Sequence, residues 1–153
     1  MTARRRLLAA ASATFALAAL TACEKPAPLV TVVSGGESVY AEAVAFCFDE
    51  GSTLDSGTCA TRHEGATRLS VRAGDKIGVD VDKELTDRSW QLTLVDPNSP
   101  DSPQTSPTIV DNHYFSFTAP GLAPGGRLML VVQTLDPAQQ PTGEWQFELI
   151  PRA

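Results

Sequence analysis

Histidine is scarce in this sequence of 153 residues, and the shortage bears on metal chemistry. A blue-copper centre needs two histidines and a cysteine, usually with an axial methionine. The chain has only His63 and His113, no cysteine lies near its C-terminal end, and Met129 falls in the middle of a predicted strand. We therefore expect no copper site, and the sequence indicates no other cofactor.

Catalytic signatures are also absent. The sequence has no G-x-S-x-G nucleophile elbow, and the VSGGES stretch around Ser34 is typical of a turn. His113 shares the inward phase predicted for Phe115 and Phe117, and a histidine hydrogen-bonded to backbone at the rim of a strand explains this phase. A catalytic or ligand-binding role for His113 is the alternative. Because no set of acid, base and nucleophile is visible, the sequence predicts that the protein is not an enzyme.

No apolar run in the sequence is long enough for a typical membrane helix. The run from Leu7 to Leu20 would rise about 21 Å as a helix, whereas the hydrocarbon core is about 30 Å thick. Arg4, Arg5 and Arg6 precede this run, and that order is typical of a signal peptide. The Arg4–Leu8 stretch also resembles a twin-arginine export signal, so the general and the twin-arginine routes both stay open.

The residues that follow the apolar run point to a lipid anchor. Leu20-Thr21-Ala22-Cys23 resembles the bacterial lipobox, whose cysteine receives a diacylglyceryl group and becomes the new N-terminus. We predict that Cys23 is lipidated and that its acyl chains, such as palmitate, hold the protein on the extracytoplasmic face of the cell membrane. The alternative is a secreted protein with a free, reactive cysteine at its N-terminus.

Basic residues are outnumbered, 12 against 18 acidic ones. Without the three signal arginines, nine basic residues remain, so the mature chain has a formal charge of −9. This balance excludes the basic patch that nucleic-acid binding requires. It also argues against electrostatic attraction to anionic lipid head groups, so the lipid must do the anchoring.

The cysteine count is odd, which is unusual for an exported protein. Assigning Cys23 to lipid leaves Cys47 and Cys59, which we expect to form a disulfide in an oxidising compartment. In the chain-entropy model, so short a loop stabilises the fold by roughly 3 kcal/mol. The rival interpretation takes Cys47, Cys59 and His63 as metal ligands, but it lacks a fourth ligand and a known zinc spacing.

Short alternating segments follow a brief tether stiffened by Pro26 and Pro28. Leu69 and Val71, then Ile77, Val79 and Val81, alternate around an Ala-Gly-Asp turn and predict a β-hairpin or strand pair. Further inward-facing sets are predicted in later strands, with a proline-rich exposed loop at 97–107: Trp90, Leu92 and Leu94; Phe115 and Phe117; Trp145, Phe147 and Leu149.

These strands predict an all-β protein, an antiparallel β-sandwich with Ig-like or cupredoxin-like topology behind an N-terminal signal helix. Both Cys47 and Cys59 precede Trp90, so the immunoglobulin order of cysteine, tryptophan, cysteine fails, and "Ig-like" describes architecture only. We predict a signal peptide at 1–22, a lipidated cysteine and tether at 23–29, and one sandwich domain at 30–153.

Two surface features are candidate sites. Asp80, Asp82 and Glu84 fall on one predicted strand face, where carboxylates could bind calcium, although a solvated face with alternating acids is the commoner explanation.

The segment RLMLVVQTLD has two apolar faces, and the second consists of Met129, Val131 and Leu135. Either a loop such as 97–107 covers these residues, or they form an interaction surface for a partner.

The chain resembles a group of small actinobacterial lipoproteins catalogued as a domain of unknown function. The resemblance runs from KPAPLVTVVSGGESVY through the Cys47–Cys59 segment to LSVRAGDKIGVDVDKELTDRSWQLTL. It implies attachment to the outer face of a Gram-positive cytoplasmic membrane, and it assigns no catalytic residues.

The sequence therefore predicts a monomeric, membrane-anchored lipoprotein of the cell envelope that binds an envelope protein or a small ligand without catalysis. The alternative is a ligand- or metal-binding lipoprotein, either a calcium binder or a cupredoxin relative without its metal. An envelope enzyme is the third hypothesis.

Overall fold

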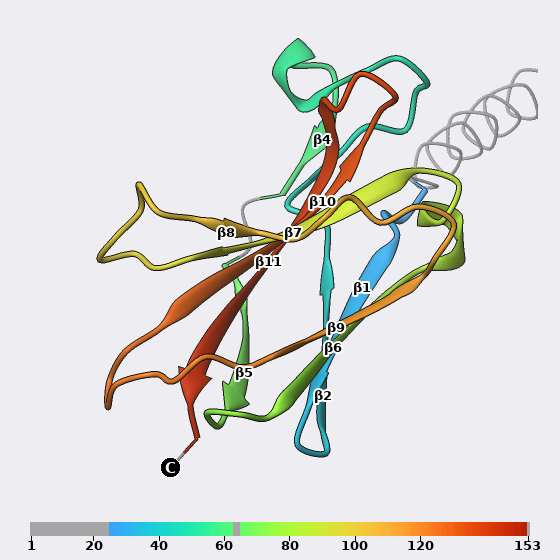
Figure 1. Cartoon of the computed structure of the whole chain (residues 1–153). Helices are drawn as coiled ribbons and strands as arrows, with labels where there is room; N and C mark the ends of the chain where they lie inside the picture. Colours follow the sequence, from blue (N-terminus) through green and yellow to red (C-terminus); the bar gives the residue numbers. More distant parts are fainter. Residues whose placement is uncertain (1–24, 63–64, 153) are drawn as a thin grey trace, which may run out of the picture.

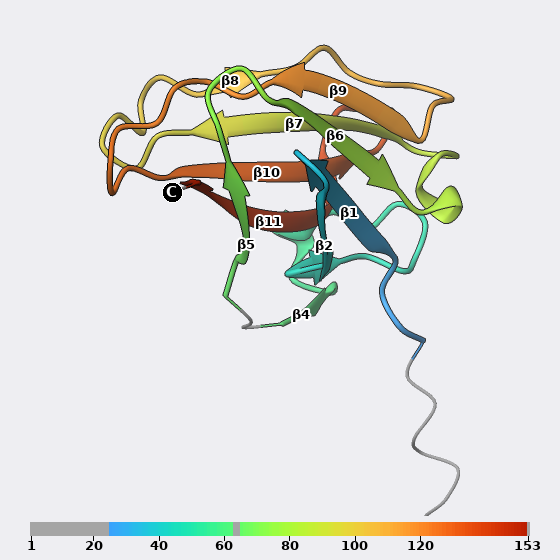
Figure 2. The same ribbon diagram turned by 90° about the horizontal axis from the view of Figure 1, so that it is seen from below.

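The computed structural model describes residues 25–62 and 65–152, and strands make up most of its regular structure. Two sheets pack face to face as a sandwich (Figures 1 and 2). This confirms the predicted all-β sandwich. The predicted signal helix and Cys23 lie outside the described residues. In the described part of the chain, no helix is long and apolar enough to cross a membrane.

The smaller sheet has four strands in the order β2-β1-β6-β9, and all of its pairs are antiparallel. Its strands are β1 (Leu29–Ser34), β2 (Glu37–Glu42), β6 (Lys76–Val81) and β9 (Tyr114–Thr118). The short 3-10 helix η3 (Lys83–Leu85) follows β6. The sheet therefore ends in β2 on one side and in β9 on the other.

The larger sheet has seven strands, ordered β4-β3-β11-β10-β7-β8, with β5 on the far half of β11. Its strands are β3 (Ala45–Phe46), β4 (Ala60–Thr61), β5 (Thr67–Val71), β7 (Ser89–Val95), β8 (Gln104–Thr105), β10 (Leu128–Leu135) and β11 (Pro141–Pro151). Another 3-10 helix, η2 (Leu54–Ser56), lies between β3 and β4. The β5–β11 pair is parallel, so the antiparallel prediction fails for this pair alone among the described ladders.

The predicted pairing of β5 with β6 is wrong. β5 pairs with β11 in the larger sheet, whereas β6 pairs with β1 and β9 in the smaller one. The turn at Gly74, which has φ +86°, carries the chain from one sheet to the other. Leu69 and Ile77 are both buried because they enter the same core from opposite sides. Alternation identifies the inward face of a strand, but it does not identify the sheet to which the strand belongs.

Two tryptophans fill the centre of the core, and neither is exposed. The indole N–H of Trp90 donates to the carbonyl of Asn112 at 2.7 Å, and that of Trp145 donates to the carbonyl of Pro28 at 3.0 Å. Each buried N–H therefore has an acceptor, as a tryptophan in an apolar core requires. The second bond fastens the end of the tether to β11.

One side of the sandwich is closed by hydrogen bonds between the sheets. The guanidinium of Arg152 donates to the carbonyl of Ser34 in β1 at 3.2 Å and to that of Ser70 in β5 at 2.8 Å. The hydroxyl of Thr67 in β5 donates to the carbonyl of Tyr40 in β2 at 3.4 Å. The opposite side, between β9 and the β7–β8 pair, has a groove instead.

Candidate functional site

An apolar groove lies on the open side of the sandwich. Its volume is about 250 Å³. Leu92 and Leu94 of β7 line it from the larger sheet, and Phe115 and Phe117 of β9 line it from the smaller one. Leu92 is buried, while the other three side chains are half-buried against the core. Apolar side chains of both sheets thus face solvent on this side of the sandwich.

The rim of the groove carries no charge. It consists of four polar residues and one proline: Gln104, Thr105, Ser106, Thr118 and Pro120. No Asp, Glu, Lys or Arg is found among the described residues that line the groove. A pocket with an apolar floor and a few polar rim groups is the usual form of a small-ligand or peptide site.

Local sequence explains why the groove stays open. Pro103 and Pro107 flank β8 and cannot donate to a strand ladder, so β8 is only two residues long. Ser106 keeps the segment on β7, because its backbone N–H donates to the Leu92 carbonyl at 2.9 Å and its hydroxyl accepts from the Leu92 N–H at 3.0 Å. The larger sheet therefore ends in a short, fixed edge.

Sequence reasoning placed all four apolar lining residues on inward faces but did not predict a groove. The groove arises because β9 and β8 end their sheets without meeting, which is a non-local property. A local signal was the aromatic segment YFSFT, which carries no charge although it forms an edge strand.

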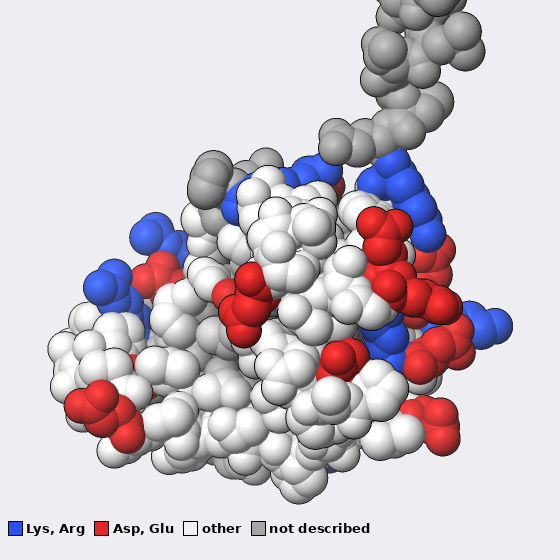
Figure 3. Space-filling model, turned by 90° about the horizontal axis from the view of Figure 1, so that it is seen from above, with Lys and Arg blue, Asp and Glu red and all other residues white. Residues whose placement is uncertain are grey.

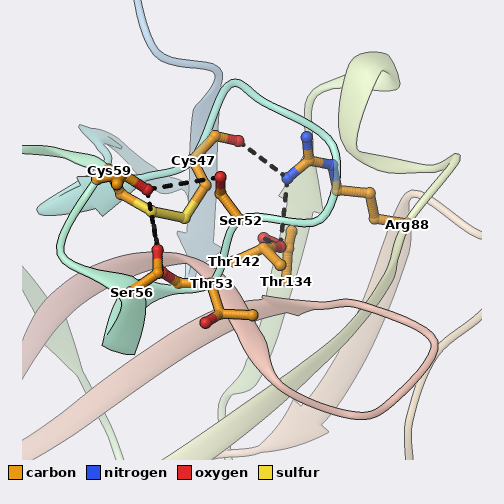
Figure 4. The surroundings of a disulfide bond; sticks show 9 residues. Cys47, Ser52, Thr53, Ser56, Cys59, Arg88, Thr134 and Thr142 are labelled. Atoms are coloured by element: carbon orange, nitrogen blue, oxygen red, sulfur yellow. Dashed lines mark hydrogen bonds between the residues drawn. A yellow bond between two sulfur atoms is a disulfide. The ribbon is translucent and has the colours of Figure 1, made fainter.

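Cys47 and Cys59 form the expected disulfide, and their Cα atoms are 4.4 Å apart (Figure 4). Phe46 and Ala60 are paired in the β3–β4 ladder. Cys47 directly follows Phe46, and Cys59 directly precedes Ala60. The disulfide thus extends this ladder by one position and closes the loop that contains η2. His63, the third residue of the rival metal interpretation, lies outside the described residues, and the two sulfur atoms of that interpretation are bonded to each other.

Arg88 fixes the disulfide segment to the larger sheet (Figure 4). Its guanidinium donates to the carbonyl of Cys47 at 3.3 Å and to the hydroxyl of Thr142 at 3.2 Å. The same group lies over the ring of Phe46, 5.0 Å from its centroid. A cation in this position gains from the ring quadrupole while satisfying two acceptors.

The acidic residues predicted on one face are each engaged separately. Asp80 bonds the Nδ1 of His113 at 2.9 Å, and Asp82 accepts from the backbone N–H of Leu29 at 2.7 Å. Glu84 pairs with Lys25 at 3.3 Å. Across residues 25–62 and 65–152, no three His, Cys, Asp or Glu side chains are grouped so that they could hold a metal ion.

His113 is at the rim of β9, but its side chain points to solvent and not into the core. It is 63% exposed, and its ring pairs with a carboxylate instead of a backbone group. Its backbone carbonyl accepts from Val81 at 2.9 Å. The inward-facing alternation of β9 therefore begins at Phe115, and the prediction that His113 shares it is wrong.

The outer face of β10 is partly covered. Met129 and Val131 are half-buried, whereas Leu135 is 3% exposed. The register of β10 with β7 runs unbroken to Leu135, which is buried although it does not belong to the main hydrophobic core cluster. Segment 97–107 extends the same sheet through β8 at the β7 edge. Of the three residues of the predicted interaction surface, only Met129 and Val131 are partly exposed. A role of this surface in binding stays a prediction.

Glu148 of β11 is paired with Met129 on the outer face of the larger sheet, and its pKa is shifted by the fold. Arg68 donates from its Nε at 2.6 Å, and Arg127 donates from its Nη1 at 3.4 Å. The hydrogen bond from Arg68 lowers the pKa of the Glu148 carboxyl, and partial desolvation opposes this effect. The arrangement holds a carboxylate between two cations and leaves it ionised.

An acidic hollow of about 580 Å³ lies at the end of the sandwich where the tether enters. Figure 3 looks onto this end, where red acidic groups gather. The carboxylates that line the hollow are Asp49, Glu50, Glu84, Asp87 and Asp136. Because Glu84 also pairs with Lys25, the negative charge lies beside the N-terminal start of the described residues.

Comparison with known proteins adds no assignment. No protein-family model matches the chain, and no curated protein is significantly similar to it. The geometry of the described residues therefore carries the functional proposal.

Proposed function

We propose that the chain is a lipid-anchored, non-catalytic binding module of the cell envelope and that it binds its ligand in the groove between β7, β8 and β9. The observation that carries the proposal is the solvent-open apolar floor formed by Leu92, Leu94, Phe115 and Phe117. An exposed apolar patch in a soluble domain is a common mark of a binding surface.

The uncharged lining limits the ligand. Burying a charge against the groove without a partner would cost several kcal/mol, so the group that enters is apolar. The polar rim at Gln104 and Thr105 can hydrogen-bond a neutral part of the ligand. This chemistry matches neither nucleic acid nor an anionic head group.

In this proposal, lipid on Cys23 anchors the domain to the extracytoplasmic face of the cell membrane. The domain acts there as a monomer. The Trp145–Pro28 hydrogen bond supports a short connection, because it fixes the domain only five residues after Cys23. The acidic tether end would be repelled by anionic lipids, so the acyl chains and not the surface charge hold the protein there.

Fluorescence titration with the neutral apolar dye Nile red tests the groove. The protein used is residues 23–153 carrying Cys23→Ser, which contains every strand of the sandwich and no lipid. We expect saturable dye binding that Leu94→Asp weakens about tenfold or more, because the new carboxylate must be desolvated in the groove.

Val131→Asp is the matched control, since it places the same charge at a half-buried strand position on the outer face of β10. Circular dichroism confirms that both variants are folded. Equal binding by Leu94→Asp and the parent protein would contradict the proposal. Loss of binding in Val131→Asp alone would move the site to the outer face of β10.

A further inference from the structure

The open side of the sandwich has an unpaired strand next to the groove. β9 ends the order β2-β1-β6-β9, and within the described chain no strand pairs with its outer edge. The other long side is closed, because Arg152 joins the carbonyls of Ser34 and Ser70 across the two sheets. The sandwich is therefore asymmetric, with one fastened side and one side open to a further strand.

The ladder register identifies which β9 groups face outward. The N–H of Ala119 donates to the carbonyl of Asp75 at 2.7 Å. Six residues earlier, the carbonyl of His113 accepts from Val81 at 2.9 Å. Hydrogen-bonded and non-hydrogen-bonded pairs alternate in an antiparallel ladder, so the odd-numbered residues of β9 direct their backbone groups towards β6.

The even-numbered residues consequently direct their backbone groups to the free edge. Tyr114 has its N–H bonded to the side chain of Asn112 at 3.0 Å, which leaves its carbonyl facing out. Ser116 and Thr118 each present both an N–H and a carbonyl. These five groups form a row of donors and acceptors with the spacing of a strand ladder.

This edge lacks the usual protection against pairing. Exposed edges are normally blunted by charges, prolines, bulges or very short strands. The outer strand β2 begins and ends in glutamates, Glu37 and Glu42, and β4 and β8 have two residues each. β9 has five residues without a charge or proline, and its pairing with β6 has no register shift.

The groove lies where the side chains of an added strand would point. Phe115 and Phe117 face it from β9, and a strand beside β9 would direct alternate side chains into the same space. There they would meet Leu92 and Leu94 of β7. Backbone groups and side-chain pockets are thus arranged together, as strand addition requires.

We infer that the groove ligand is an extended peptide that adds to β9 as a fifth strand, with alternate apolar side chains in the groove. This inference rests on the proposed binding function of the groove. Exposed acids precede both lining segments, Asp101 before β8 and Asp111 before β9. Charge complementarity therefore favours a peptide whose apolar core is flanked by lysine or arginine.

The test uses the lipid-free protein and the synthetic peptide acetyl-KVTVTVK-amide. We expect binding to slow amide hydrogen exchange at Ser116 and Thr118 about tenfold or more, measured by NMR. Exchange at the outer edge of β2, on the closed side of the sandwich, is the control within the molecule and stays unchanged. Two modified peptides, N-methylated at the threonines or at the valines, remove the donors from one edge of the added strand at a time. One of them binds about tenfold more weakly and the other does not, because only one edge faces β9.

Three results overturn the inference. If Nile red binds the groove but the peptide protects neither amide, the ligand is not a strand, and the proposed function stands. If neither probe binds, the proposed function fails as well. If Ser116 and Thr118 are protected without peptide and sedimentation shows a dimer, a second copy of the chain occupies the edge.

Discussion

Arg152 is the side chain that fastens the closed side of the sandwich. It is 21% exposed and also donates to the carboxylate of Glu37 at 3.1 Å. Because hydrogen bonds to charged groups contribute more than neutral ones, its loss should be measurable in the free energy of unfolding. Arg152 affects the proposed function only indirectly, because it closes one side of the sandwich and leaves the opposite side for a ligand.

We predict that Arg152→Met lowers the free energy of unfolding by about 2 kcal/mol, because the bonds across the two sheets are lost while the aliphatic stem is retained. Urea denaturation measures the change. Arg127→Met is the control, since Arg127 is 61% exposed and its ion pair should contribute less than about 1 kcal/mol. Equal effects of the two substitutions would contradict the role given to Arg152.

Glu148 should make stability depend on pH. Its pKa is lower in the folded protein than its usual value of 4.5, so its contribution is present above that value and is lost as pH falls through the folded-state pKa. We predict that the difference in unfolding free energy between the parent protein and Glu148→Gln is constant near neutrality and shrinks below about pH 5.

Arg68→Gln supplies the control for Glu148. Removing the closer cation should return the carboxyl pKa towards its usual value, which an NMR titration of the Glu148 side chain records directly. An unchanged titration in Arg68→Gln would show that this cation is not the cause of the lowered pKa.

The disulfide acts at the scale of one element, the β3–β4 pair. Each of these strands has two residues, too few to be stable as an isolated ladder. The Cys47–Cys59 bond closes a loop with a sequence separation of 12 residues beside them. We predict that Cys47→Ala combined with Cys59→Ala lowers stability by about 3 kcal/mol, measured by chemical denaturation.

The groove is remote in sequence from the disulfide, so we expect loss of the disulfide to leave ligand binding unchanged. Nile red affinity should stay the same in the folded double variant, because none of the groove-lining residues belongs to segment 47–59. A loss of dye binding at temperatures where the variant is folded would connect this loop to the groove.

Alternation predicted the inward faces of the strands well. The buried residues Leu69, Ile77 and Trp90 were all placed in the core from their period of two. The pairing of β5 with β11 was not predictable, because this parallel contact joins segments about 80 residues apart and depends on the whole fold. The burial of Leu135, which alternation places with Met129 and Val131, was not predictable either, because it depends on what covers the end of β10.

The site was predictable only in part. Phe115 and Phe117 were placed on the inward face, but their partial exposure follows from the gap between two sheet edges. That gap depends on where β8 ends, and β8 was assigned to a proline-rich loop. The acids at Asp80 and Asp82 formed a clear sequence pattern, yet the fold gives each its own hydrogen-bond partner.

At the scale of the whole molecule, the proposed lipid anchor and the acidic end would have opposing effects. The chain has 18 acidic residues against 12 basic ones, and part of this excess negative charge lies at the tether end (Figure 3). Lipid on Cys23 would hold this end near the bilayer against electrostatic repulsion. Binding to the membrane would then depend on the acyl chains and hardly on salt.

We predict that the full-length protein fractionates with membranes and that Cys23→Ser no longer yields a lipidated form, measured by detergent phase partitioning of whole cells. High salt should not release the parent protein. Salt-dependent release, or unchanged partitioning of Cys23→Ser, would contradict the lipid anchor. Cys59→Ser serves as the control, because it removes a cysteine outside the lipobox.

The most direct test of groove binding is to locate a bound apolar probe by NMR. Intermolecular nuclear Overhauser effects between Nile red and the lipid-free protein report protons within about 5 Å of each other. Binding in the groove predicts contacts from the dye to the methyl groups of Leu92 and Leu94 and to the rings of Phe115 and Phe117. Contacts to Met129 and Val131 instead, with none to these four residues, would contradict the proposed site.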